Sequence, residues 1–256
     1  MPLKYPLVHV DDIRPENMKE GEGWAISEFR LPISGRNGSS TTLFHSIFRP
    51  GSTHAKHLHR NCDEIAVYLK GYGAVGQGNE RTNVRAGHCR VMPRGSEHFF
   101  YNETKDEEEL PRVGKLSNGI LVHIDDVKPS RMNEKDGWSI TDFRIPIGRH
   151  NGSPTTLFWA KFMPGAVHKK HRHENCEELY YIVRGHGLAG AGPDRAEVRA
   201  GHVHYIPKGV EHFLYNLSKT EPLEAIGIYV GAGSVEETGY VYAGDVTEAD
   251  IKARTV

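Results

Sequence analysis

The chain has few cysteines and no excess of charge of either sign, and both absences exclude classes of protein. Cys62, Cys89 and Cys176 are its three cysteines, too few for the disulfide framework of a small secreted domain. The 32 basic residues are balanced by 33 acidic ones. Because there is no positive excess to attract nucleic acid or an anionic membrane, we expect a small molecule as the partner.

Long apolar runs are also absent. None approaches the roughly 20 residues that a membrane-spanning helix needs. The N-terminus, MPLKYPLVHVDDIRPEN, has no apolar core of signal-peptide length before its first acidic residues. Together with the cysteine content, this predicts a soluble, cytoplasmic protein. At 256 residues, the chain is long enough for two modest domains.

The most prominent feature present is a tandem repeat. A shift of 114 residues places Trp24 on Trp138, and the register then holds without a gap through the histidine-rich segments. The opening segments also match, with VHVDDI at 8–13 and VHIDDV at 122–127. A period this long indicates a duplicated domain rather than a solenoid.

Each half consists of short runs typical of strands. Segments such as TTLFHSIF, EIAVYLKG and ELYYIVRG are rich in β-branched and aromatic residues and alternate with turn residues. This predicts an all-β barrel or sandwich in each half. Helix should be scarce, and confined to the neighbourhood of DDIRPENM, DDVKPSRM and the tail VTEADIKA. The charged tract KDEEEL is the natural linker, so we predict an N-terminal domain at 1–115 and a C-terminal domain with an extended tail at 116–256.

The two halves differ at one point. After Asn216 the second half continues into EAIGIYV, whereas the first half passes from Asn102 into the acidic linker. The first half therefore lacks a copy of IGIYV. Because an uncovered sheet edge invites aggregation, we expect a segment from elsewhere in the chain to complete the first sheet.

A repeated set of histidines and a glutamate predicts metal binding. Alternate side chains share one face of a strand, so His57 and His59 point the same way. Glu64 follows the turn-prone RNCD and His98 follows the turn PRGSE, so both can return to the same point. Three imidazoles and a carboxylate suit Fe, Mn, Ni, Co, Cu or Zn. The same set recurs at identical spacing, which predicts one divalent transition metal in each half, the second held by His171, His173, Glu178 and His212.

These residues also carry a family resemblance. The first half contains GSTHAKHLHRNCDEIAVYLKG at 51–71 and GHCRVMPRGSEHFFYN at 87–102; the second contains GAVHKKHRHENCEELYYIVRG at 165–185 and GHVHYIPKGVEHFLYN at 201–216. Both pairs resemble the two signature motifs of the cupin superfamily. The resemblance implies a bicupin, with two tandem double-stranded β-helix (jelly-roll) barrels and the metal ligands named above. It says little about the reaction, because cupins catalyse many reactions and also include storage and regulatory proteins.

Two further histidines are candidates for catalysis. Bicupin oxalate decarboxylases usually have a substrate-orienting arginine three residues before the first motif histidine, where this chain has His54 and His168. An imidazole cannot offer the bidentate fork of a guanidinium, but it can carry a proton near neutral pH. Strict alternation from His57 places His54 on the outer face, whereas a bulge would bring it inside.

Two tyrosines are also candidates. Counting by twos from the glutamates puts Tyr68 and Tyr180 on the inner face, where each either contacts substrate or simply fills the core. His204, which the repeat aligns with Arg90, is a further residue of interest.

The sequence is compatible with three functions. We favour a metal-dependent oxidoreductase of the dioxygenase type that acts on a small oxygenated metabolite. A metal-assisted isomerase, hydrolase or lyase, with His54 or His168 as proton carrier, is the alternative, and a non-enzymatic metal-binding or ligand-binding protein is the third. Cupins commonly pair barrel edges, which is compatible with a homo-oligomer, although two barrels in one chain already form a pseudo-dimer.

Overall fold

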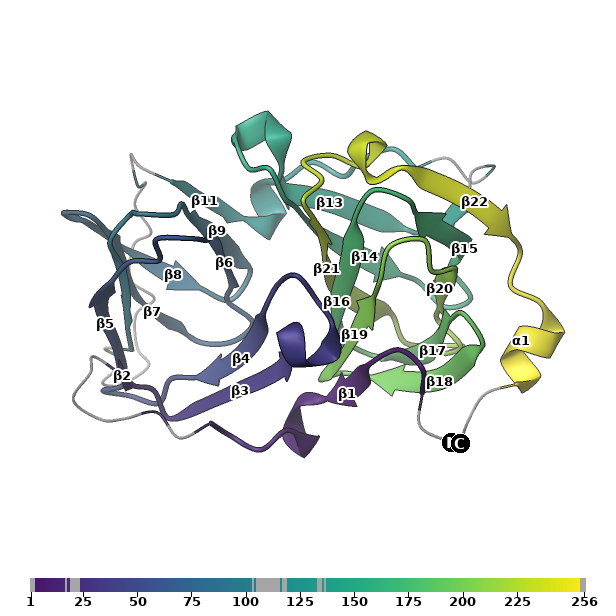
Figure 1. Cartoon of the computed structure of the whole chain (residues 1–256), viewed down its shortest axis with the longest axis horizontal. Coiled ribbons are helices and arrows are strands. Elements are labelled where there is room, and N and C mark those ends of the chain that lie inside the picture. Colours follow the sequence, from purple (N-terminus) through teal and green to yellow (C-terminus); the bar gives the residue numbers. More distant parts are fainter. Residues whose placement is uncertain are drawn as a thin grey trace. The chain divides into compact units, whose positions relative to one another are not determined.

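Regular structure in this protein is almost entirely β. The computed structural model describes residues 3–16, 18, 24–102, 104, 116, 119–132, 135 and 137–253. Within these residues the only α-helix is α1 (Glu248–Lys252), and no helix is long and apolar enough to cross a bilayer. The predicted all-β fold is therefore confirmed (Figure 1).

The chain divides into two compact units. The first barrel comprises residues 14–31 and 44–127, and the second barrel comprises residues 1–13, 32–43 and 128–256. Each unit is built from antiparallel sheets. The domain boundary predicted at residue 115 from the sequence repeat stays a prediction, because the linker KDEEEL lies outside the described residues.

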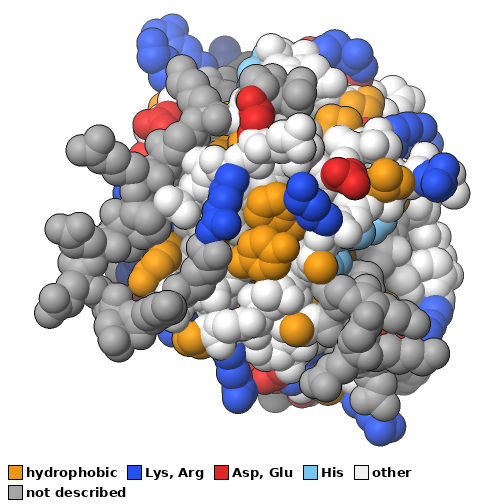
Figure 2. Space-filling model, turned by 90° about the vertical axis from the view of Figure 1, so that its left-hand side faces the viewer, with side chains coloured by type: hydrophobic (Ala, Val, Ile, Leu, Met, Phe, Trp, Pro, Cys, Tyr) orange, Lys and Arg blue, Asp and Glu red, His pale blue; other side chains and the backbone are white. Residues whose placement is uncertain are grey.

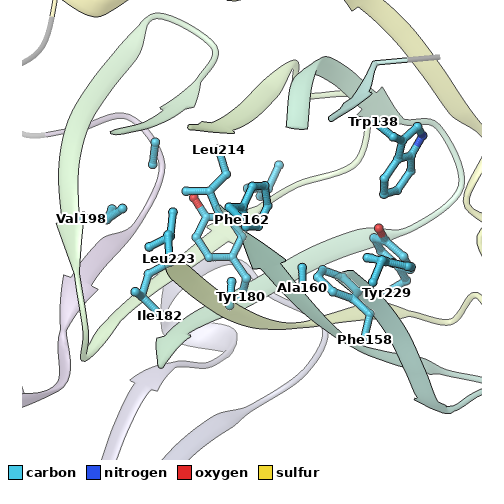
Figure 3. Close-up of a cluster of buried hydrophobic side chains, with 14 of the residues drawn as sticks. Trp138, Phe158, Ala160, Phe162, Tyr180, Ile182, Val198, Leu214, Leu223 and Tyr229 are labelled. Atoms are coloured by element: carbon cyan, nitrogen blue, oxygen red, sulfur yellow. The ribbon is translucent and has the colours of Figure 1, made fainter. Parts of the chain in front are cut away.

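The second barrel has two large sheets. One runs in the order β1 (Leu7–His9), β19 (His202–Ile206), β16 (Glu177–Arg184), β21 (Leu223–Val230), β14 (Thr156–Phe162) and β13 (Asp142–Ile147). The other runs in the order β12 (Trp138–Ser139), β15 (Val167–His173), β20 (His212–Tyr215), β17 (His186–Ala191) and β18 (Asp194–Arg199), and β22 (Tyr240–Gly244) also pairs with β15. The buried faces of both sheets supply one aromatic-rich core, in which Phe158, Phe162 and Tyr180 lie together (Figure 3).

The first barrel has the corresponding strands in smaller sheets. Five strands run in the order β2 (Trp24–Ala25), β5 (Thr53–His57), β10 (His98–Tyr101), β7 (Tyr72–Gln77) and β8 (Glu80–Arg85). Three more run in the order β11 (Ile120–His123), β9 (His88–Met92) and β6 (Glu64–Val67), while β3 (Glu28–Ile33) pairs with β4 (Leu43–Ile47).

The opening segment of each sequence half pairs in the barrel built mainly from the other half. Strand β1 lies against β19 in the second barrel, with His9 opposite His202. Strand β11 lies against β9 in the first barrel, with His123 opposite His88. Each opening strand continues into a single 3-10 turn, η1 (Val10–Asp12) or η3 (Ile124–Asp126), at two of the places where a little helix was expected.

A histidine holds each exchanged segment in place. His9 Nε2 donates to the carbonyl of Ala200 at 2.9 Å, and His9 Nδ1 accepts from the amide of Asp11 at 3.2 Å. The ring lies against Gly201, whose backbone has φ of +94° and where a Cβ would come within 2.5 Å of His9 Nε2. Only glycine fits such a position. The same contacts recur in the first barrel between His123 and Ala86, Asp125 and Gly87.

The strand β21, which contains the IGIYV segment, has no counterpart in the described part of the first barrel. In the second barrel β21 lies between β16 and β14. In the first barrel, strand β11 comes from the other half of the sequence, as expected. It pairs with β9, just as β1 pairs with β19 in the second barrel, so β11 is the counterpart of β1. The expectation of an exchanged segment is therefore correct in kind, but the segment does not take the place of β21.

Deletion of residues 3–13 is predicted to destabilise the second barrel selectively, because it exposes the edge of β19 that β1 covers. In hydrogen exchange followed by mass spectrometry, peptides that span 202–206 should lose protection. Peptides that span 88–92, the matching strand of the first barrel, serve as the control and should keep theirs. Equal protection at 202–206 before and after the deletion would contradict the exchange of strands.

Candidate metal centres

Four predicted ligands meet in the first barrel. His57 ends β5 and pairs with His98, the first residue of β10, while His59 lies just beyond β5 and Glu64 begins β6. The ligand atoms of these four residues all lie within 4.8 Å of one another. The second barrel brings its own set together within the same limit, from β15, β16 and β20: His171, His173, Glu178 and His212.

Backbone hydrogen bonds fix the orientation of the imidazoles. His57 Nδ1 donates to the carbonyl of Ala55 at 2.8 Å, and His98 Nδ1 donates to that of Ser96 at 3.0 Å. In the neutral ring, donation from Nδ1 leaves the lone pair on Nε2, which faces the cluster and can bind a metal ion, whereas a protonated ring can donate from Nε2 to the glutamate. The second barrel repeats this arrangement, with His171 donating to Lys169 at 2.7 Å and His212 donating to Val210 at 2.9 Å.

A buried nitrogen without a partner indicates that the ligand set of the second barrel fits a metal ion. His171 is only 1% exposed, yet its Nε2 has no hydrogen-bond partner among the described residues. A buried polar atom of this kind normally has a partner. A cation held by Nε2 satisfies it, and neutral imidazoles with a carboxylate are a suitable donor set for a divalent transition metal.

Each carboxylate is held in its ionised form. Glu64 Oε2 lies 2.8 Å from His59 Nε2 and 3.2 Å from His98 Nε2. Burial by itself would raise the pKa of Glu64, but the hydrogen bonds and charges of His98 and His59 lower it to about 2. Glu178 Oε2 lies 3.0 Å from the Nε2 atoms of both His173 and His212, which hold its pKa well below the usual range despite burial.

His54 and His168 both lie beside the ligands. The His54 ring stacks on that of His57 with centroids 3.8 Å apart, and the His168 ring stacks on that of His171 at 3.6 Å. Strict alternation does not apply here, because the pairing of β10 with β5 shifts register between His98 and Phe100. Burial, followed by the neighbouring charge of His57, lowers the pKa of His54 to about 4, so this imidazole is neutral at pH 7.

The two candidate tyrosines occupy different positions. Tyr180 is buried, and its hydroxyl lies 2.7 Å from His204 Nδ1. Tyr68 lies just beyond β6, stacks on Phe100 at 5.6 Å and approaches the guanidinium of Arg90. The repeat in the sequence draws attention to His204 but gives Arg90 no role; the signal for Arg90 is a charged residue in the middle of the strand HCRVM.

A narrow cavity adjoins the second centre. His168, His171, Glu178 and His212 line it together with Tyr180 and several aromatic side chains. The free space between these side chains is about 20 Å³, which is room for roughly one water molecule. Any ligand that enters this cavity without rearrangement must therefore be very small.

A C-terminal segment, residues 240–252, covers the second centre and is called the strap below. Its strand β22 pairs with β15, with Tyr242 opposite His171 and Tyr240 opposite His173. The Tyr240 ring stacks on that of His171 with centroids 5.1 Å apart. Nothing in the sequence of this tail indicates that it lies against the metal centre.

Ion pairs anchor the strap through α1. The buried carboxylate of Asp250 accepts from Lys170 Nζ at 2.8 Å and from Arg195 Nη2 at 2.7 Å. Burial would raise the pKa of Asp250, but the hydrogen bonds from Lys170, Thr247 and Arg195 lower it below its ordinary value. The anchor is therefore present above about pH 4, the ordinary pKa of an aspartate, and is lost as the pH falls through the lowered pKa.

The first centre is more open to solvent. The side chains of His59 and Glu64 are 34% and 15% exposed, against 2% and 5% for His173 and Glu178. Within the described residues, β22 has no counterpart on β5. Figure 2, which views the molecule from the side of the first barrel, shows histidine side chains reaching the surface.

Comparison with known proteins identifies the family. A family profile described as Cupin domain matches residues 44–110 and again residues 158–229, together more than half of the chain. The chain belongs to the cupin family. Its two matched copies make it a bicupin, and each barrel of this bicupin carries one transition-metal site.

Curated relatives include plant cupins. Oxalate oxidase GF-2.8 of Triticum aestivum is 32% identical over 117 residues, which cover 42% of this chain and 52% of the relative. Germin-like protein 3-5 of Oryza sativa subsp. japonica is 37% identical over 98 residues, which cover 35% of this chain and 43% of the relative. The bicupin thus spans about half the length of the curated relatives it matches.

Solved structures share the complete fold. Oxalate decarboxylase of Lactobacillus farciminis, in a formate complex, superposes with a TM-score of 0.69 at 14% identity over 94% of this chain and 89% of its own. A structure of Bacillus subtilis oxalate decarboxylase from a study of its Mn(II) centres has a TM-score of 0.69 at 14% identity, over 99% of this chain and 84% of its own. This likeness confirms the two tandem cupin barrels.

Substitution of one ligand is predicted to remove one metal equivalent. Wild-type bicupin purified without chelator should contain about two equivalents by elemental mass spectrometry, and His57→Ala and His171→Ala should each contain about one, because each loses an imidazole from a different centre. The exposed His186→Ala is the control and should retain both. Protein that stays free of metal even after reconstitution would contradict both sites.

Weakening the strap is predicted to expose the second centre. In the His57→Ala background, Asp250→Asn removes charge-assisted contacts worth about 1.5 to 3 kcal/mol, so a chelator should strip the second centre roughly tenfold faster. Glu248→Gln breaks only an exposed pair with Lys252 in the same helix and should change the rate little. Identical rates for both variants would show that the strap does not limit access.

Proposed function

We propose that this bicupin is a cytoplasmic metal-dependent enzyme that acts on a small oxygenated metabolite, by oxygen-dependent chemistry of the dioxygenase type. The observation that carries the proposal is the duplicated cluster of three histidines and a glutamate, with ligand atoms within 4.8 Å of one another. With four protein ligands, a six-coordinate ion would leave two positions open for substrate and a second reactant. The three cysteines, which stay as free thiols, support the cytoplasmic location.

The protein groups at each centre have distinct tasks. A bound transition metal supplies Lewis-acid polarisation of the substrate oxygens and, for a redox metal, electron transfer. His57 and His98 are held in one tautomer by Ala55 and Ser96. His54, stacked on His57 and neutral at pH 7, is too weak a base to carry a proton near neutral pH as the sequence suggested, but it can accept a hydrogen bond from a substrate hydroxyl.

A second candidate function is favoured by one observation in the second barrel. The Tyr180 hydroxyl and His204 Nδ1 lie 2.7 Å apart in the buried interior. Burial raises the pKa of Tyr180 and lowers that of His204 to about 3, so both groups are neutral at pH 7. Proton transfer within such a pair is strongly unfavourable, so its role would be to orient a substrate oxygen by hydrogen bonding, which suits isomerase, hydrolase or lyase chemistry without oxygen.

Oxalate is one substrate to test. The relatives named above include oxalate oxidases and oxalate decarboxylases, which supports a small carboxylate. One feature argues against oxalate itself. His54 and His168 occupy the positions where oxalate decarboxylases usually have an arginine, and an imidazole cannot form the two parallel hydrogen bonds that a guanidinium donates to a carboxylate. A non-enzymatic binding role is the third possibility, and it predicts binding without turnover.

Oxygen dependence separates these functions. Metal-reconstituted protein is incubated with small carboxylates, including oxalate, and hydroxy-ketones, while an oxygen electrode and product analysis follow the reaction. We expect substrate-dependent oxygen uptake that is lost under argon and in the His57→Ala, His171→Ala double variant. Equal product formation under argon would favour the acid–base alternative, and binding without product would favour the non-enzymatic one.

A further inference from the structure

An arginine crosses the interior of the first barrel. Arg90 on β9 is 1% exposed and lies opposite Ala66 of β6, so its side chain shares the inner face with Glu64, two residues earlier on β6. The guanidinium reaches the facing sheet, where Nη2 donates to the carbonyl of Gly76 and Nη1 lies 3.5 Å from that of Phe99.

The charge of Arg90 is not neutralised within the described residues. No carboxylate there forms an ion pair with Arg90, and its Nε has no hydrogen-bond partner. The carbonyls of Gly76 and Phe99 solvate the guanidinium without cancelling its charge. A buried ion without a counter-ion is strongly destabilising, so among the described residues Arg90 is left able to bind an anion.

The guanidinium lies next to the metal ligands. Phe99, whose carbonyl faces Nη1, directly follows the ligand His98. The Tyr68 hydroxyl lies beside Arg90 on the same inner face, and the interior of this barrel thus carries a metal cluster with a fixed positive charge behind it.

The second barrel differs at the same positions. The repeat places His204 on Arg90 and Tyr180 on Ala66. There the hydroxyl of Tyr180 and Nδ1 of His204 satisfy each other at 2.7 Å, and neither group is charged at pH 7. One chain therefore combines a cationic interior in the first barrel with a neutral one in the second.

We propose that Arg90 is the anion anchor of the first centre and binds the carboxylate of the substrate, while the other substrate oxygens face the metal. An arginine in this place supplies the charge-assisted contact that His54 cannot. This inference rests on the proposed function and specifies its substrate class for the first barrel.

Calorimetric binding tests the anchor independently of turnover. The protein is the metal-loaded His171→Ala variant, in which only the first centre is intact, and the probes are glycolate and its neutral analogue glycolamide. Arg90→His installs the residue that the second barrel carries at this position. It should weaken glycolate binding at least tenfold and change glycolamide binding little. The exposed Arg81→His is the matched control and should bind glycolate as its parent does.

Folding is checked by metal content and circular dichroism. A folded, metal-loaded Arg90→His variant that binds glycolate as tightly as its parent would overturn the proposal. If that variant does not fold, nuclear magnetic resonance on the zinc-loaded parent decides. Glycolate, but not glycolamide, should then shift one buried arginine Nε–H signal, and the absence of that shift would equally overturn the proposal. Failure of the proposed function alone would leave carboxylate binding intact and only turnover missing.

Discussion

The burial of one ionised carboxylate among imidazoles is the constraint on which each barrel depends. Glu178 is 4% exposed, and an unpaired carboxylate at such depth would be strongly destabilising. Its oxygen instead meets two histidine nitrogens at 3.0 Å. The surrounding strands serve this arrangement, since the carbonyls of Lys169 and Val210 fix the tautomers of His171 and His212.

A register shift in each ligand-bearing pair of strands decides where the histidine that precedes the ligands lies. Without the register shift between His168 and His171, simple alternation would place His168 on the outer face. With it, the His168 ring stacks on that of His171 and is removed from solvent. Burial then lowers the pKa of His168, so the ring that stacks on the ligand His171 is neutral rather than positively charged.

Two centres with the same ligands have acquired different surroundings. The strap and its Asp250 anchor cover the second centre, whereas the ligands of the first remain partly exposed. The interiors differ as well, with Arg90 in one and the pair of Tyr180 and His204 in the other. The two copies thus share the same set of metal ligands but differ in the polar side chains of their inner strands.

The sequence by itself determined the duplication, the all-β class and both ligand sets, because these depend on local spacing and on strand alternation. It also placed Tyr180 on the inner face. It did not determine that His54 turns inward, that β1 and β11 exchange between barrels, or that the strap covers one centre. Those features depend on a bulge, on long-range strand pairing and on ion pairs such as that of Asp250 with Lys170. Residues far apart in the chain meet only once the sheets have closed, so only the tertiary structure decides which side chains become neighbours.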